Sequence, residues 1–348
     1  MRLSLRSVSR ILSIIGTAGL IVAWVPGIAS AAPHGGGNFT CNGTLASPGT
    51  LAGNYANVYV AGVCLVDAGN VNVSGNLMVG PGASLVADFG QNDLTQSGTS
   101  NLTVHGNVAI LQGASALLGC YPLQVTLWGE GPSGPNMFTT PDFPCDDDPN
   151  AFPASGNSAP TLSATETIDG NLVSDDPLGV VVHNTTVRGN VVDNGGGGGT
   201  AFNPQGIFAQ YIPSGPPAAP GQLDTEPFQL PPYFDFANVA VGGNLVLTGA
   251  SVNWYGIDRD TVRGNLVDTG NTAMPDGNEV FNNTVYGNLV CSGNNPAVEY
   301  GDSNGGPDEV GGNATGECGF NVLIPNPSPI SVPGLTTYPQ DHISVRLH

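Results

Sequence analysis

Hydrophobic and polar residues recur along this chain in one short phrase. In each copy an aliphatic residue precedes a variable residue and a Gly-Asn pair, and further aliphatic residues follow. Clear copies begin at Asn72, Thr103, Thr167, Thr186, Ala240, Thr261, Thr284 and Glu309, and a weaker copy begins at Thr50. An aliphatic residue between polar neighbours is typical of a strand with one face in a core and the other in water. The phrase therefore predicts two short strands joined by a Gly-Asn turn.

The spacing of the copies predicts a repetitive solenoid. The glycines of successive Gly-Asn pairs lie 22, 31, 64, 19, 54, 21, 23 and 25 residues apart, so most spacings are near 22. A period of about 22 residues that carries strands and turns, with no helical pattern, is typical of one coil of a parallel β-helix. The two long spacings are interpreted as one or more unmarked coils plus a loop, with Gly/Pro-rich insertions at 131–160 and 194–232.

Stacking of the coils gives the Gly-Asn pair a structural role. Gly adopts positive φ without steric cost and Asn tolerates it better than most residues, so the pair suits a corner between two strands. Coils about 4.8 Å apart place the asparagines above one another, where their amides bond along the stack. The expected ladder consists of Asn54, Asn76, Asn107, Asn171, Asn190, Asn244, Asn265 and Asn288. An outward column of stacked threonines is also expected, with Thr103, Thr167, Thr186, Thr261 and Thr284 as members.

Residues 41–322 resemble the right-handed parallel β-helix superfamily, in which coils of this length often carry an asparagine ladder at a turn. The resemblance implies an all-β fold, a single-stranded right-handed parallel β-helix solenoid with Gly/Pro-rich loop insertions. We expect about ten coils in one domain over 32–322. The superfamily includes polysaccharide lyases and hydrolases, but a likeness of fold does not transfer function.

The first 31 residues have the pattern of a secretory signal peptide. Arg2, Arg6 and Arg10 precede an apolar run over 11–25, and small residues at 29–31 form a cleavage site. No later stretch reaches the roughly 18 consecutive apolar residues of a membrane-spanning helix. We therefore expect a secreted, extracellular or cell-surface protein with no transmembrane segment after cleavage, and a Pro-rich C-terminal tail over 323–348.

Six cysteines agree with export, because disulfides persist outside the reducing cytosol. None lies in the C-x-x-C spacing of a zinc or redox site. Sequential pairing is the preferred arrangement of the 15 that are possible, because each sequential pair is separated by about one coil. The predicted disulfides are Cys41 with Cys64, Cys120 with Cys145, and Cys291 with Cys318.

Charge excludes one class of partner and leaves another open. The chain has no lysine, 7 arginines and 27 acidic residues, with a net charge of -20, so it lacks the basic surface that nucleic-acid binding requires. Acidic loops at Asp146, Asp147 and Asp148 and at 302–309 have oxygen ligands of the kind that bind calcium. Neither loop matches a known calcium motif, so solvated surface loops with no cofactor are the preferred interpretation.

The two insertions supply the candidate ligand site. Insertions on a rigid solenoid tend to collect binding residues, and these two are separated by about two coils, so we expect them to wall one groove. The groove would contain Asp146, Asp147 and Asp148 from one insertion and Phe208, Tyr211 and Tyr233 from the other. Acids together with aromatic rings suit neutral sugars or cation-bridged partners, but packing of the long loop on the scaffold is the preferred interpretation of the aromatic residues.

No catalytic constellation is evident. His105, Asp169, Arg188 and Arg263 share one outward position of the repeat, yet no motif places two carboxylates, or an acid and a base, in one cleft. The preferred hypothesis is a secreted non-catalytic structural or adhesive protein of the cell surface or extracellular matrix, with glycans or other surface proteins as partners. The alternatives are a carbohydrate-active enzyme or glycan-binding protein of pectate-lyase-like architecture, and a calcium-dependent assembly module.

Overall fold

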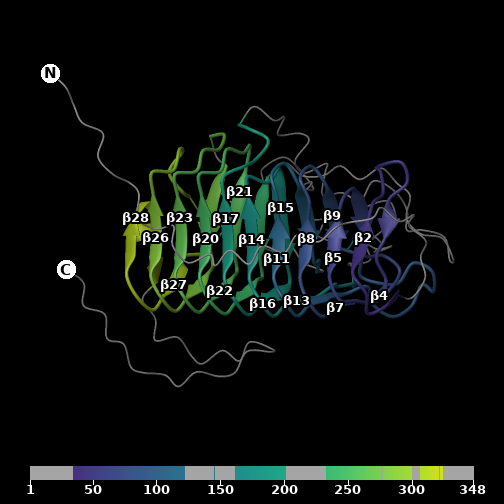
Figure 1. Ribbon diagram of the computed structural model, residues 1–348. Coiled ribbons are helices and arrows are strands. Elements are labelled where there is room, and N and C mark those ends of the chain that lie inside the picture. The colour runs from purple at the N-terminus through teal and green to yellow at the C-terminus, as the bar shows by residue number, and fades with distance from the viewer. Residues whose placement is uncertain are drawn as a thin grey trace, which may run out of the picture.

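The chain is an all-β parallel solenoid (Figure 1). The computed structural model describes residues 34–121, 145, 161–200, 233–275, 277–299, 306–320 and 322–323. Within these ranges 29 strands form three parallel sheets, and the helical element is the short 3-10 helix η3 (Glu317–Phe320). Across the same ranges, no helix has the length and apolar character that crossing a membrane demands.

We name the three sheets A, B and C in the order in which each coil visits them. Sheet A contains β1 (His34–Gly35), β4 (Gly53–Tyr55), β7 (Val71–Val73), β10 (Leu102–Val104), β13 (Glu166–Ile168), β16 (Thr185–Val187), β19 (Ala240–Val241), β22 (Thr261–Val262), β25 (Thr284–Val285), β27 (Asp308–Val310) and β29 (Val322–Leu323). Sheet B contains β2 (Phe39–Cys41), β5 (Val58–Val60), β8 (Leu77–Val79), β11 (Val108–Ile110), β14 (Leu172–Asp175), β17 (Val191–Asn194), β20 (Leu245–Thr248), β23 (Leu266–Thr269), β26 (Leu289–Ser292) and β28 (Ala314–Gly316). Sheet C contains β3 (Gly49–Thr50), β6 (Val63–Leu65), β9 (Ser84–Ala87), β12 (Ser115–Leu118), β15 (Gly179–His183), β18 (Phe234–Ala237), β21 (Tyr255–Asp258) and β24 (Asn278–Phe281).

Each coil begins at its sheet A strand, and we number the coils from the N-terminus. Ten coils have both a sheet A and a sheet B strand, which agrees with the expected number. Aliphatic residues of the phrase, such as Val73, Val104 and Val187, point inward and form one continuous core along the axis. We call the turns between successive sheets the AB, BC and CA corners.

The two long spacings contain no extra coil, so that part of the prediction is wrong. Val108 pairs directly with Leu172 across the spacing of 64, and Val191 pairs directly with Leu245 across the spacing of 54. Each long spacing is therefore one coil with a loop inserted into it.

The asparagine ladder is present at the AB corner. In coils 3 to 10 the backbone N–H of each asparagine donates to Oδ1 of the asparagine one coil earlier, at 2.8 to 2.9 Å. The members are Asn57, Asn76, Asn107, Asn171, Asn190, Asn244, Asn265, Asn288 and Asn313, and Nδ2 of Asn57 donates to Asn38 in the first coil. One amide side chain per coil thus satisfies a corner N–H that would otherwise have no strand partner.

Asn54 is not a member of this ladder, contrary to the prediction. It lies in β4 and pairs with Asn72 on sheet A, while Asn57 occupies the ladder position below Asn76. The second coil has Ala56 where later coils have the turn glycine, and its turn is one residue shorter, so matching the letters Gly-Asn selected the wrong asparagine.

Close approach between coils, and not positive φ, explains the glycine of the phrase. The eight turn glycines from Gly75 to Gly312 all have φ outside the left-handed region, which corrects the reason given by the sequence. A Cβ on Gly189 would lie 2.5 Å from Oδ1 of Asn171 and 2.5 Å from the carbonyl oxygen of Gly170. Any side chain at this position displaces the ladder.

Side chains also link the coils at the other two corners. At the BC corner the backbone N–H of Ala250 donates to Asn271, that of Asn271 to Asn294, and that of Asn294 to Glu317. At the CA corner the corresponding N–H groups of Val239, Asp260 and Asn283 donate to the side chains of Asp260, Asn283 and Asp308. The later coils are therefore tied together at all three corners.

All three predicted disulfides are present. Cys41–Cys64 joins the first two coils, Cys291–Cys318 joins coils nine and ten, and Cys120–Cys145 ties the first insertion to the scaffold. The threonine column is confirmed as well, with Ala240 as its one interruption.

The packing at the turn predicts that Gly189→Ala destabilises the fold by about 1 to 3 kcal/mol, the usual cost of overpacking. Gly37→Ala is the matched control, because Gly37 precedes the ladder residue of the first coil and a Cβ there meets no atom within 4 Å. Urea unfolding of both variants measures the difference. Equal losses in the two variants would contradict close packing as the reason for the glycine.

Candidate functional site

Five of the six predicted site residues lie outside the described residues. These are Asp146, Asp147, Asp148, Phe208 and Tyr211. The sixth, Tyr233, precedes β18 and is fully buried. Its ring packs against Val181 and makes an edge contact with Trp254, with the ring centroids 6.0 Å apart. At this position the aromatic ring belongs to the packing of sheet C.

The two insertions begin at different corners of the solenoid. The first follows β12 and leads into sheet A, so it lies at the CA corner of the fourth coil. The second follows β17 and leads into sheet C, so it lies at the BC corner of the sixth coil. The separation of two coils is confirmed. The outer side of sheet C is therefore the surface that lies between the bases of the two insertions.

The densest group of titratable side chains in the described residues lies on this side of sheet C. We call it the corner cluster and define it as Tyr121, His183, Asp235, Asp258 and Arg259. Nε2 of His183 lies 3.0 Å from Oδ2 of Asp235, and both side chains are almost fully buried, with exposures of 3% and 0%. Nη2 of Arg259 lies 2.5 Å from Oδ2 of Asp258 and donates to the hydroxyl oxygen of Tyr121 at 2.8 Å. The Tyr121 ring makes an edge contact with the His183 ring, so the two pairs form one group.

Burial controls the protonation of this group. It raises the pKa of the Tyr121 hydroxyl far above its ordinary value, and the nearby Arg259 only partly opposes this effect. Burial likewise raises the pKa of the adjacent Asp260 well above its usual range, with the charges of Asp258 and Asp235 acting in the same direction. Tyr121 and Asp260 are therefore held in their neutral forms beside the His183–Asp235 and Arg259–Asp258 pairs.

Arg259 occupies a backbone position that usually requires Gly or Asn. Its φ is 56°, and the same corner position in other coils holds Asn184, Asn238 and Asn282, all with positive φ. An arginine in the left-handed region costs about 1 kcal/mol. The contacts to Asp258 and Tyr121, together with the Phe281 ring 6.0 Å from the guanidinium carbon, hold it there.

The outward position shared by His105, Asp169 and Arg188 forms a second group, on the AB corner. Nδ1 of His105 lies 2.6 Å from Oδ2 of Asp169, and Nη1 of Arg188 lies 2.9 Å from the other oxygen, Oδ1. His105 and Arg188 are about half exposed, and Asp169 is between them in successive coils. An exposed ion pair contributes about 0 to 1 kcal/mol, so this group is a charge-balanced surface ladder.

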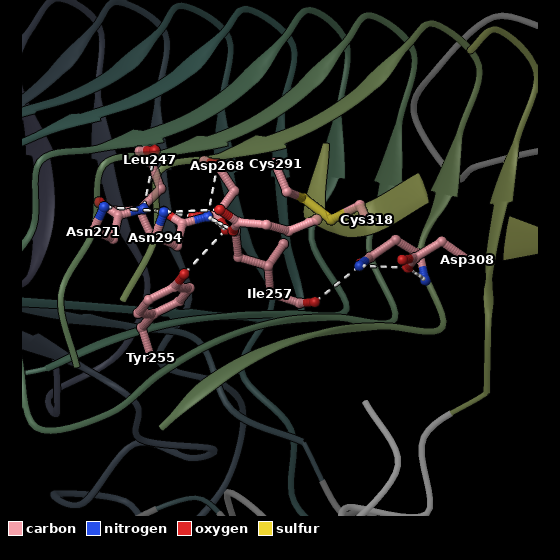
Figure 2. Close-up of a disulfide and its surroundings, with 11 residues drawn as sticks. Leu247, Tyr255, Ile257, Asp268, Asn271, Cys291, Asn294, Asp308 and Cys318 are labelled. Atoms are coloured by element: carbon pink, nitrogen blue, oxygen red, sulfur yellow. Dashed lines mark hydrogen bonds between the residues drawn. A yellow bond between two sulfur atoms is a disulfide. The ribbon is translucent and has the colours of Figure 1, made fainter. Parts of the chain in front are cut away.

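Several carboxyl groups inside the solenoid were not predicted, among them Asp193, Asp268 and Asp308. Asp268 accepts hydrogen bonds from the Tyr255 hydroxyl at 3.0 Å and from Nδ2 of Asn294 at 2.9 Å, next to the Cys291–Cys318 disulfide (Figure 2). Burial raises the pKa of Asp268 to about 7, although these bonds oppose it. Burial raises the pKa of Asp193 to about 8 and that of Asp308 to about 7. A signal was available for Asp193 and Asp268, because strict alternation from Val191 and Leu266 turns the third residue of these two sheet B strands inward.

In the described part of the acidic loop at 302–309, the interpretation as a solvated surface loop is wrong for Asp308. Asp308 is buried and accepts hydrogen bonds from the backbone and side-chain nitrogens of Asn283, as a member of the CA ladder. Among the residues that the structure describes, no three His, Cys, Asp or Glu side chains converge in a way that would hold a metal ion. Calcium binding at 146–148 concerns residues outside the described ranges.

No protein-family model, curated protein or solved structure matches this chain.

The buried acids predict that stability decreases as the pH rises. Each is protonated in the folded state at a pH where the unfolded chain is ionised, so its contribution is complete below about pH 4 and is lost as the pH rises through the folded pKa of about 7 or 8. Asp193→Asn removes one of these groups. Between pH 4 and pH 9 the free energy of unfolding of this variant should therefore decrease less than that of the wild type, and the two slopes should differ by up to about 1.4 kcal/mol per pH unit.

Urea unfolding at a series of pH values checks this expectation. Asp175→Asn is the matched control, because Asp175 is exposed on the outer face of the neighbouring strand β14. A wild-type stability that rises between pH 4 and pH 8, or an Asp193→Asn curve with the wild-type slope, contradicts it.

Proposed function

We propose that the protein is an exported, non-catalytic structural or adhesive solenoid of the cell surface or extracellular matrix. Its fold is assigned in this proposal to the right-handed parallel β-helix superfamily, and its partners are glycans or other surface proteins. The scaffold is long, stiff and regular, which suits presentation of a surface better than turnover of a dissolved substrate.

The main support for the proposal is that polar side chains along the axis form contacts between successive coils. The asparagine ladder bonds coil to coil through the AB corner, and His105, Asp169 and Arg188 bond to one another on the adjacent outward position. Residues that a pectate-lyase-like enzyme would direct at substrate are therefore engaged in contacts between coils. The His183–Asp235 pair lies below the surface of the described residues.

Export is supported by two independent features. The first 31 residues have the charge and hydropathy pattern of a signal peptide, and the three disulfides favour an oxidising compartment. One disulfide joins the first two coils and another joins coils nine and ten, so both ends of the solenoid are held closed by covalent bonds. Such bonds suit a protein that works outside the cell.

One observation favours the alternative, a carbohydrate-active enzyme or glycan-binding protein. The corner cluster combines a His-Asp pair, an arginine and a tyrosine between the bases of the two insertions, and Arg259 has a strained backbone there. Strain and buried charge often accompany function. Under this alternative Arg259 and His183 would be the residues to test first.

A polysaccharide screen separates the two functions. Purified protein is incubated with neutral and acidic polysaccharides, with and without calcium, while reducing ends and unsaturated products are measured. In parallel, retention of the protein on surfaces coated with the same polysaccharides is recorded. The proposal predicts no product from any polysaccharide, and saturable retention on at least one surface.

Product formation that disappears in Arg259→Asn, with the folded state intact by circular dichroism, contradicts the proposal and supports the enzyme. Asn282→Ala is the control, because it alters the neighbouring position of the same corner and leaves the corner cluster unchanged. Neither product nor retention on any glycan or matrix surface contradicts the adhesive part of the proposal.

A further inference from the structure

The outer side of sheet B carries a continuous column of uncharged, mostly apolar side chains. We call it the valine face; its members are Tyr59, Met78, Ala109, Val173, Val192, Val246, Val267 and Val290. They occupy equivalent positions in successive coils, so they form one straight row about 4.8 Å apart. All are at least partly exposed, and Met78 and Val173 are 41% and 40% exposed.

Apolar side chains on the outer side of sheet C are largely buried, unlike those on the outer side of sheet B. Val86 and Val181 lie on the outer side of sheet C, yet their exposures are 0% and 2%. The chain thus covers the apolar column of sheet C and leaves that of sheet B open to solvent. Monomeric proteins rarely leave a long contiguous apolar patch exposed, so the open column indicates an interaction surface.

Charge determines which partner fits. Among the outward side chains of the described sheet B strands, Asp175 is the one charged residue, in a protein with a net charge of -20. Asp193 and Asp268 of sheet B are buried on its inner side, and Asp235, Asp258 and Glu279 belong to sheet C. The valine face therefore lacks the charges that recognise an ionic partner, and two acidic copies approach one another along it with little local repulsion.

We infer that the valine face is the interface for a second copy of this chain. Two identical faces related by a two-fold axis present rows of the same spacing, so β-branched side chains of one row pack between those of the other, as in stacked sheets about 10 Å apart. This association goes beyond the proposed function and does not depend on it.

The size of the face predicts a weak, reversible dimer. Its eight residues span seven steps of about 4.8 Å, and a strand width of about 10 to 13 Å then gives roughly 400 Å² on each copy. The total of about 800 Å² is below the standard size of a stable interface and falls in the range of weak, transient contacts. Added salt screens the repulsion between two acidic copies and strengthens the dimer.

Analytical ultracentrifugation of the full secreted chain tests the inference, over a range from about 1 µM to about 1 mM protein and at low and high salt. The test variant is Val192→Asp with Val267→Asp, which places two charges in the valine face in coils six and eight. The control is Thr186→Asp with Thr261→Asp, which places the same charges in the same coils on sheet A. Circular dichroism and melting temperature confirm that both variants are folded.

The expected result is a wild-type monomer–dimer equilibrium that shifts toward the dimer at high salt. The valine-face variant should weaken it at least about tenfold, and the sheet A variant less than about twofold, because only the first buries charge in the contact. A wild-type monomer at every concentration and salt overturns the inference. So does an equal loss in both variants, or a folded valine-face variant that dimerises normally. A monomer that loses retention on a glycan surface only in the valine-face variant also overturns it, and assigns the face to adhesion.

Discussion

The hydrogen bond from a backbone N–H to the asparagine one coil earlier is the interaction on which the rest of this structure depends. It fixes the distance between coils at the AB corner, so the turn glycine has no space for a side chain. It also fixes the register of sheets A and B, because each sheet A strand ends at that corner and the following sheet B strand begins there. The inward valines, the outward threonines and the outward valines then fall into columns because every coil leaves the corner at the same residue.

A narrow solenoid has consequences for the charged residues that its coils contain. Strands of two to five residues enclose a narrow interior in which an inward polar side chain is buried, so Asp193 and Asp268 are neutralised or bonded by neighbouring side chains. On sheet C the outward residues are also buried, and acids there pair with His183 and Arg259. Several of the 27 acidic residues are therefore buried with raised pKa values, which favours the folded state under acid conditions.

The repeat made the fold, the number of coils, the threonine column and all three disulfides predictable, because each follows from period and alternation. Asn54 was misassigned because a turn shortened by one residue changes the register without changing the letters. The corner cluster was not predicted because His183 and Asp235 are 52 residues apart, and pairing across an insertion depends on β15 and β18 being neighbours. Alternation within Phe234–Ala237 does direct Asp235 away from the core, but only the structure shows that this outer side is buried.

Hydrogen exchange at single residues tests the ladder most directly. The ladder asparagines lie at exposed or half-exposed corners, where a backbone N–H without a partner exchanges rapidly with solvent. The account predicts that the N–H groups of Asn107, Asn190, Asn244 and Asn265 exchange as slowly as those of the core strand residues Val108, Val191, Leu245 and Leu266. Rapid exchange of the ladder amides, with the strand amides still protected, would contradict it.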